Sequence, residues 1–537
     1  MTENRSQKNY VMALTLVATL GGLLFGYDTA VISGAVKSLQ NHFIDSLYGN
    51  DIIAAKVIWQ YQLSVVVVIY LIALSISAIF IKLYGKIRGL AFSLTLLIIT
   101  SFLLFYFMGR HNILNEETAN SLKGFTISSA LVGCILGGSI GGFVSRQAGR
   151  KRGLILAAVL FTISAIGSAL PDVLNIFMVQ DVISFIIFRI IGGIGVGLAS
   201  MLSPMYIAEI APPENRGKLV SWNQFAIIFG MLIVYFVNYF IALQGSDQWL
   251  STQGWRWMLG SETIPALIFL VLLLFVPETP RFLVMRNREE QALGLLEKLG
   301  IGDRANQVLG EIRESLSVKD APWLSYGGIL ILIGILLSVF QQFVGINVVL
   351  YYAPEIFRNM GSKTDTSLLQ TIIVGAVNLS FTVVAIYTVD RFGRKPLQII
   401  GALGMAVSMA GLGFSFFLGQ VGMVALLFML LYTASFAVSW GPVTWVLLSE
   451  IFPNKIRGAM SIAVAAQWIA NLMISWTFPI MNDNSWLTGI FHHGFAYWLY
   501  GIMGILAALF VWKLVPETKG KTLEEMDNLW RPKINEQ

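Results

Sequence analysis

Fourteen apolar segments of this chain are each long enough to cross a lipid bilayer as an α-helix. They cover residues 10–32, 57–81, 89–109, 124–144, 153–170, 181–204, 219–243, 258–276, 325–353, 370–389, 396–418, 421–448, 459–480 and 496–515. A helix satisfies its own backbone groups in hydrocarbon, and the segments lack the strict alternation that a membrane β-barrel needs. Hydrophobic residues make up 56% of the 537 residues and charged residues only 12%. We therefore predict an all-α membrane protein.

Three polar motifs occur twice in the chain, with the copies about 240 residues apart. They are a Glu followed seven residues later by Arg-Gly, a Gly-Arg-Lys loop and a Pro-Glu-Thr sequence. The copies begin at Glu209 and Glu450, at Gly149 and Gly393, and at Pro277 and Pro516. A parallel repeat in a hydrophobic chain is typical of a carrier with two bundles around a central site.

The repeat also predicts how the chain is divided. Six spans per half suffice for the duplication, but the first half contains eight. Because the loop after 124–144 matches the loop after 370–389, the surplus lies upstream, and 57–109 is predicted to be a transmembrane hairpin inserted after the first span. We expect a first bundle over 1–276, a cytosolic helical linker over 277–324, and a second bundle with a cytosolic tail over 325–537.

The basic residues predict the orientation, because loops rich in Lys and Arg stay in the cytosol. All the basic loops fall on one side if both termini are cytosolic. These loops are 82–88, 146–152, 209–218, 281–288, 391–395 and 455–457.

Two charged residues lie inside apolar segments, where an ionised side chain costs about 2.5 to 3.5 kcal/mol. Asp28 is either a solvated helix end or the partner of Arg189. In a pair, the cation and the burial act oppositely on the carboxylate, so its proton occupancy would depend on which side of the membrane is open. Glu262 is either a further partner of Arg189 or an interfacial anchor.

Six more charges lie at the predicted cytosolic ends of the helices. They orient the spans, and they are also candidates for a cytosolic gate, since ion pairs between bundles stabilise only the conformation that brings the partners together. The six residues are Glu209, Arg216, Arg150, Glu450, Arg457 and Arg394.

Amide and aromatic side chains within the spans predict a site for a neutral polyol. Amides both donate to and accept from hydroxyl groups, and an aromatic face packs on the C–H surface of a sugar. Each amide taken alone could equally hold two helices together. The set comprises Gln224, Gln341, Gln342, Asn347, Asn378, Gln467, Asn471, Phe25, Tyr351, Trp445 and Trp468.

Five motifs, taken together and in this order, resemble those of the sugar porter family of the major facilitator superfamily. They occupy residues 26–34, 189–193, 277–281, 341–347 and 516–520. The likeness covers almost the whole chain except about residues 40–118, the part that holds the inserted hairpin. It implies twelve core helices in two six-helix bundles, alternating access, and a sugar bound mainly by the second bundle.

The resemblance also implies roles for particular positions. Asp28 matches the carboxylate that proton symporters of the family use for coupling, Arg189 matches its partner, and Glu262 lies near that pair. The principal sugar contacts are matched by Gln224, Gln341, Gln342, Asn347 and Trp445, with Tyr351, Asn378, Gln467 and Trp468 nearby. Met231 departs from the family, because xylose carriers have a glutamine there.

The resemblance implies proton-coupled import of a monosaccharide, with D-xylose as the first candidate, by a monomer in a bacterial inner membrane. No metal, nucleic acid or cofactor other than the coupling proton is expected. One alternative is an uncoupled uniporter for hexoses or pentoses. A membrane sugar sensor is disfavoured because no long cytosolic extension is present. An enzyme is disfavoured because the spans contain no nucleophile-base pair or metal cluster.

Overall fold

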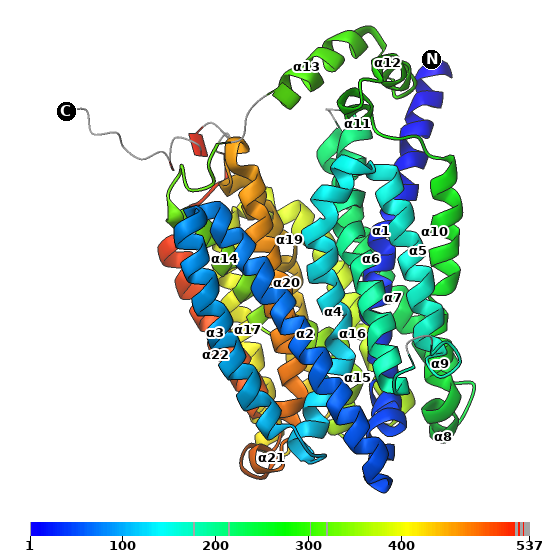
Figure 1. Ribbon diagram of the computed structural model, residues 1–537, viewed down its shortest axis with the longest axis vertical. Coiled ribbons are helices and arrows are strands. Elements are labelled where there is room, and N and C mark those ends of the chain that lie inside the picture. The colour runs from blue at the N-terminus through cyan, green and yellow to red at the C-terminus, as the bar shows by residue number, and fades with distance from the viewer. Residues whose placement is uncertain are drawn as a thin grey trace, which may run out of the picture.

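The computed structural model describes residues 2–175, 178–212, 215–300, 302–317, 321–520, 525–526 and 530. Fourteen helical segments in this part of the chain are long and apolar enough to cross a membrane. They correspond one to one with the fourteen predicted from the sequence, so the all-α membrane prediction is confirmed. Figure 1 shows them side by side as two bundles.

The first bundle contains the N-terminal helix and the helices that follow the hairpin. Their bounds are α1 (Thr2–Leu39), α4 (Glu116–Gln147), α5 (Arg150–Ala169), α6 (Asp181–Ile210), α7 (Arg216–Ala242), α8 (Asp247–Trp249), α9 (Trp255–Gly260) and α10 (Thr263–Phe275). Helix α6 packs against both α4 and α5, and α1 packs against α7.

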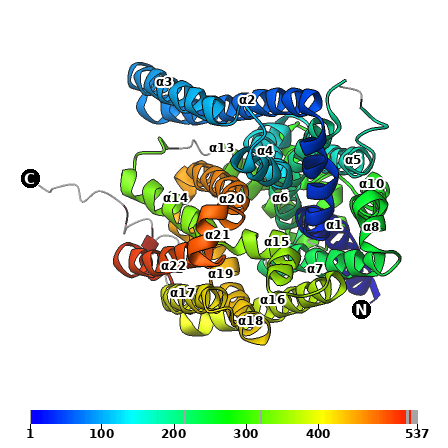
Figure 2. The same cartoon turned by 90° about the horizontal axis from the view of Figure 1, so that it is seen from below.

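The inserted hairpin consists of α2 (Asp51–Tyr84) and α3 (Lys86–Arg110). Gly85 forms the turn between them with a φ of 81°, a left-handed conformation that favours glycine. Figure 2 shows the two helices as a separate layer outside α4. Tyr61 anchors this layer, because its side chain is fully buried and its hydroxyl lies 2.7 Å from Ser121 Oγ on α4. The predicted insertion is confirmed, and its helices extend beyond the predicted 57–109 at both ends.

Three short helices connect the bundles: α11 (Pro280–Met285), α12 (Glu289–Lys298) and α13 (Ala305–Ser317). They lie at the same end of the molecule as the start of α1, at the top of Figure 1. We call this end the linker face and the other end, where α8 and α21 lie, the opposite face. Arg313 on α13 pairs with Glu289 on α12.

The second bundle contains the remaining helices. Their bounds are α14 (Gly328–Phe343), α15 (Ile346–Asn359), α16 (Thr364–Phe392), α17 (Arg394–Phe417), α18 (Met423–Val438), α19 (Trp440–Ile451), α20 (Met460–Asn482), α21 (Ser485–Phe491) and α22 (Phe495–Leu514).

Two spans of the second bundle are broken helices. Helices α14 and α15 meet at Gly345, whose φ of 92° interrupts the helix, and α18 and α19 meet at Ser439. The predicted segments 325–353 and 421–448 were each a single apolar run, so the sequence did not show these breaks. Irregular backbone at membrane depth occurs where protein or a water-filled site surrounds it.

The bundles meet mainly along α4 with α20 and α7 with α16, and α1 also contacts α15. Trp476 Nε1 on α20 donates to Ser121 O at 3.0 Å, and the Tyr235 hydroxyl on α7 donates to Leu350 O at 3.1 Å. Ser121 and Leu350 lie in the parts of α4 and α15 that run toward the opposite face. In the described structure, hydrogen bonds between the bundles therefore gather in that half.

Candidate functional site

A buried ion pair joins α1 to α6 in the first bundle. Arg189 Nη1 donates to Asp28 Oδ1 at 2.6 Å, and Arg189 Nη2 donates to the Asp28 carbonyl at 3.1 Å. The side chains of Asp28 and Arg189 are 0% and 2% exposed. Of the two sequence interpretations of Asp28, the structure therefore favours the partner of Arg189 over a solvated helix end.

Glu262, between α9 and α10, is the third charge of this site. Its side chain is buried and interacts with both Asp28 and Arg189. Asp28 Oδ2 and Glu262 Oε1 are both buried, and neither has a hydrogen-bond partner among the described residues. Two carboxylates in one buried place cannot easily both be ionised, and a proton on either one satisfies an otherwise unpartnered oxygen.

The predicted amides of the second bundle form a chain at the α14–α15 break. Gln341 Nε2 donates to the Trp440 carbonyl at 2.9 Å, and Gln342 Nε2 donates to Gln341 Oε1 at 3.4 Å. Asn347 Nδ2 in turn donates to Gln342 Oε1. Trp440 begins α19, so this chain connects the two helix breaks. Broken helices place hydroxyl-binding amides and backbone carbonyls together inside the bundle.

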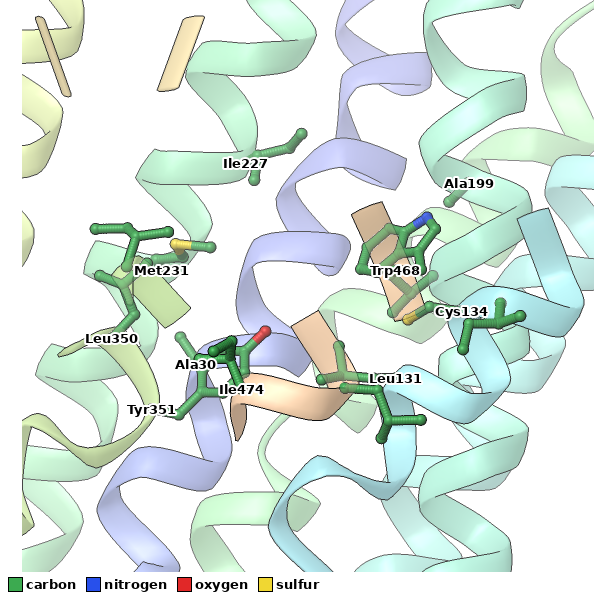
Figure 3. Packing of buried hydrophobic residues seen from close by; sticks show 14 of the residues in the cluster. Ala30, Leu131, Cys134, Ala199, Ile227, Met231, Leu350, Tyr351, Trp468 and Ile474 are labelled. Carbon is green, nitrogen blue, oxygen red and sulfur yellow. The ribbon is translucent and has the colours of Figure 1, made fainter. Parts of the chain in front are cut away.

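Two of the predicted aromatic side chains, Phe25 and Trp468, pack against each other across the interface between the bundles. The ring centroids of Phe25 on α1 and Trp468 on α20 are 5.7 Å apart, with an angle of 47° between the rings. Figure 3 shows Trp468, Tyr351 and Met231, from three helices, around the same part of this interface. Tyr351 interacts with Asn471, an amide one turn beyond Gln467 on α20.

The remaining predicted contacts lie on four different helices. Asn378 on α16 and Gln467 on α20 are buried, whereas Gln224 on α7 and Trp445 on α19 are half-buried. Gln467 Oε1 is buried without a hydrogen-bond partner among the described residues. An amide oxygen in this position is free to accept a hydrogen bond from a ligand hydroxyl.

Four of the six charges predicted to form a cytosolic gate make ion pairs, and each pair lies within one bundle. Arg150 Nη2 donates to Glu209 Oε1 at 2.8 Å in the first bundle, and Arg394 Nη2 donates to Glu450 Oε1 at 2.9 Å in the second. Arg216 is exposed because it lies beyond the end of α6, at the start of α7. The side chain of Arg457 lies outside the described residues. In this conformation neither described pair joins the bundles.

Sequence reasoning noted the two Pro-Glu-Thr motifs but gave their glutamates no role. Glu278 accepts from the backbone N–H of Arg150 at 3.0 Å, and Glu517 accepts from the backbone N–H of Arg394 at 3.1 Å. Each carboxylate therefore caps the helix that carries the gate arginine, and the arrangement is the same in both bundles. Each Pro-Glu-Thr motif recurs at about the same spacing as the Gly-Arg-Lys loop. This shared repeat was the signal that could have linked each glutamate to the helix that carries the gate arginine.

The comparisons with known proteins agree with this architecture. The family model described as "Sugar (and other) transporter" matches residues 14–113 and 104–530. The chain belongs to this family. It is a family of transporters, so the prediction that the protein is not an enzyme is confirmed. Two curated relatives and one solved structure are informative.

The D-xylose-proton symporter of Escherichia coli strain K12 is 54% identical, over 98% of this chain and 96% of the relative. The glucose facilitated diffusion protein of Zymomonas mobilis is 37% identical, over 98% of this chain and 99% of the relative. The solved inward open conformation of the xylose transporter XylE from E. coli is 52% identical, with a TM-score of 0.77 over 97% of this chain and 100% of that chain. These matches confirm the sugar porter resemblance and the major facilitator fold.

Proposed function

We propose that this protein imports a monosaccharide, first of all D-xylose, together with protons by alternating access. The D-xylose-proton symporter of E. coli, 54% identical over nearly the whole chain, supports this choice of sugar and coupling ion. One observation carries the coupling: Phe25 lies one turn before Asp28 on α1, so the same helix contacts Trp468 of the second bundle and the buried ion pair. A change at the acid can therefore move an aromatic residue at the sugar site.

In the proposed cycle, the proton binds at Asp28 or is shared with Glu262. A neutral Asp28 no longer holds Arg189 by charge, which lowers the cost of moving α1 relative to α6. The sugar binds to the amide chain from Gln341 to Asn347, with its C–H faces on Phe25 and Trp468. Loss of the proton toward the cytosol restores the Asp28–Arg189 pair and resets the carrier.

The proposal places both termini and the linker face in the cytosol of a bacterium with an inner membrane, where the chain acts as a monomer. The basic loops on that face support this orientation. Hydrogen bonds between the bundles lie toward the opposite face. The likeness to an inward open structure supports the same state for this protein. The gate pairs Arg150–Glu209 and Arg394–Glu450 would then join across the bundles only after the linker face closes.

The decisive experiment replaces Asp28 by Asn and measures two activities in proteoliposomes. We expect accumulation of labelled xylose against its gradient to fall by about tenfold or more, whereas exchange of internal for external sugar continues. Asp45→Asn, at an exposed acid near the end of the same first span, is the matched control and should change neither activity. Uphill accumulation at the wild-type level in Asp28→Asn would contradict the coupling role.

The uncoupled uniporter remains a specific alternative because a facilitated diffusion protein is 37% identical to this chain. An uncoupled carrier needs no proton-binding group, whereas Asp28 and Glu262 are two buried carboxylates that can bind a proton. We therefore favour the symporter. Alkalinisation outside vesicles on addition of sugar indicates symport, and its absence together with sugar flux indicates a uniporter.

The choice of sugar is tested separately, since Met231, a buried residue of α7 (Figure 3), stands in place of the glutamine expected in xylose carriers. Uptake of labelled xylose should be inhibited more strongly by unlabelled xylose than by glucose, arabinose or galactose. Stronger inhibition by glucose would reassign the substrate while leaving the transport mechanism in place.

A further inference from the structure

Lys123 is a buried cation near the start of α4, at the opposite face. Its side chain is 4% exposed, and its ammonium contacts carboxylates on the other bundle. Lys123 Nζ lies 2.7 Å from Asp483 Oδ2, directly after α20, and also pairs with Glu355 Oε1 on α15. Lysine is rarely buried unless it is paired, because an isolated charge loses its hydration. We call these three residues the Lys123 cluster.

The Lys123 cluster lies where the backbones of the two bundles come very close. A Cβ atom added to Gly124, the next residue on α4, would be only 2.1 Å from the Trp476 carbonyl on α20. Asn482 Nδ2 donates to Asp483 Oδ1 at 2.6 Å and fixes that carboxylate from its other side. Arg358, one turn beyond Glu355 on α15, is a second cation near Glu355. The carboxylates of Glu355 and Asp483 are therefore oriented by residues of their own bundle.

Among the ion pairs in which both partners are described residues, only those of Lys123 connect the first bundle to the second. A contact of this kind stabilises one conformation and not the other. When the opposite face opens, Lys123 must leave both carboxylates. Water then solvates all three groups, but the paired state is lost.

We propose that Lys123 is a positioning residue of the transport cycle. Its ion pairs with Glu355 and Asp483 hold the two bundles together at the opposite face, which we call the outer gate. They thereby set the equilibrium between the inward-open and outward-open conformations. The proposal rests on the alternating access proposed above. It concerns the conformational equilibrium alone, so it does not depend on which sugar or ion is carried.

The test measures the width of the outer gate in detergent or nanodiscs, without any transport. Spin labels are placed at Gln248→Cys on α8 and Thr366→Cys on α16, two exposed positions of different bundles at the opposite face. Cys134→Ser removes the single native cysteine. Pulsed electron paramagnetic resonance then measures the distance between the two spin labels and gives the populations with short and long distances.

We expect Lys123→Met to raise the ratio of long to short distances by about tenfold, a change that the loss of its two ion pairs can supply. Lys37→Met is the matched control, because it removes a lysine of the same face that forms no ion pair with the second bundle in the described structure. This control should leave the distribution unchanged.

A double variant, Glu355→Gln with Asp483→Asn, removes the same ion pairs from the other side. It keeps the test available if Lys123→Met does not fold. A triple variant that adds Lys123→Met to the double variant should have the same ratio of long to short distances as the double variant. The ion pairs of Lys123 are already absent from the double variant. A distribution that stays at the wild-type ratio in both Lys123→Met and the double variant overturns the proposal.

Transport assays on the same proteins separate this proposal from the proposed function. If the wild type carries no sugar but Lys123→Met still opens the gate, the function is wrong and the role of Lys123 stands. If the wild type transports xylose and the distances do not respond, the gate proposal alone is wrong.

Discussion

The glycines of the first bundle allow its helices to come into backbone contact. A Cβ atom added to Gly193 on α6 would lie 1.8 Å from the Ala130 carbonyl on α4, and one added to Gly26 on α1 would lie 1.8 Å from the Ile227 carbonyl on α7. No flexible side chain can yield at these points, since the obstacle is backbone. The close approach of α6 to α4 and of α1 to α7 therefore depends on glycine at these two positions.

Gly193→Ala should destabilise the protein by about 1 to 3 kcal/mol, because the added methyl group forces α4 and α6 apart. Gly142→Ala is the matched control on α4, where the new Cβ would meet only Met201 Cε at 3.7 Å. Thermal unfolding in detergent, followed by fluorescence, compares the two. An unfolding temperature for Gly193→Ala equal to that of the control would show that the helices can separate at no cost.

At the scale of the element, two helices that follow Gly-Arg-Lys loops start in the same way. Gly149 and Gly393 have φ values of 97° and 92°, and each precedes a helix whose first N–H groups donate to a carboxylate of a Pro-Glu-Thr motif. Burial raises the pKa of Glu517, but backbone N–H groups of Lys519, Arg394, Lys395 and Thr518 outweigh it and lower the pKa overall. The carboxylate is thus stabilised in its ionised form at the start of α17.

Glu517→Gln should lower the stability at pH 7 by about 1 kcal/mol after allowance for solvent screening. Because the native pKa lies below the ordinary 4.5, this contribution is complete above that value and disappears as the pH falls through the native pKa. The gap in unfolding temperature between wild type and variant should therefore close in acid. Glu297→Gln, at an exposed glutamate of α12, is the control and should show little gap at either pH.

Much of the whole molecule was predictable because hydrophobic length alone determines where spans lie. The pairing of Asp28 with Arg189 was also predictable, since both are charges that hydrocarbon does not tolerate alone. The break at Gly345 was not, because apolar residues continue on both sides of it. Lys123 lies just before the predicted span 124–144, so its sequence position resembles that of an ordinary interfacial lysine. Only the fold shows that two carboxylates from the other half of the chain face it.

The hairpin of α2 and α3 gives a prediction for the molecule as a whole. Replacement of residues 51–114 by a short Gly-Ser linker should lower the unfolding temperature by roughly several degrees, since Tyr61 and Val65 are fully buried in the intact protein. Sugar binding should persist, because none of the predicted sugar contacts lies in the hairpin. Tyr61→Phe, which removes only the hydroxyl near Ser121, should cause a smaller fall.

Binding of xylose to the shortened protein, measured by calorimetry, checks this expectation. A well-folded shortened protein that no longer binds sugar would show that the hairpin supports the central site as well as the outer layer.

The same hairpin touches the end of the linker at the linker face and the second bundle toward the opposite face. Lys82 Nζ lies 3.7 Å from the centre of the Trp323 ring at one end, and the Phe107 and Trp476 rings are 6.2 Å apart at the other. If α2 and α3 move with the first bundle during the proposed rocking motion, at least one of these contacts must break in each turnover. Since most of α2 and α3 faces lipid, the thickness and lateral pressure of the bilayer act on the tilt of the hairpin. We therefore expect the turnover rate of this carrier to change with the thickness of the surrounding bilayer.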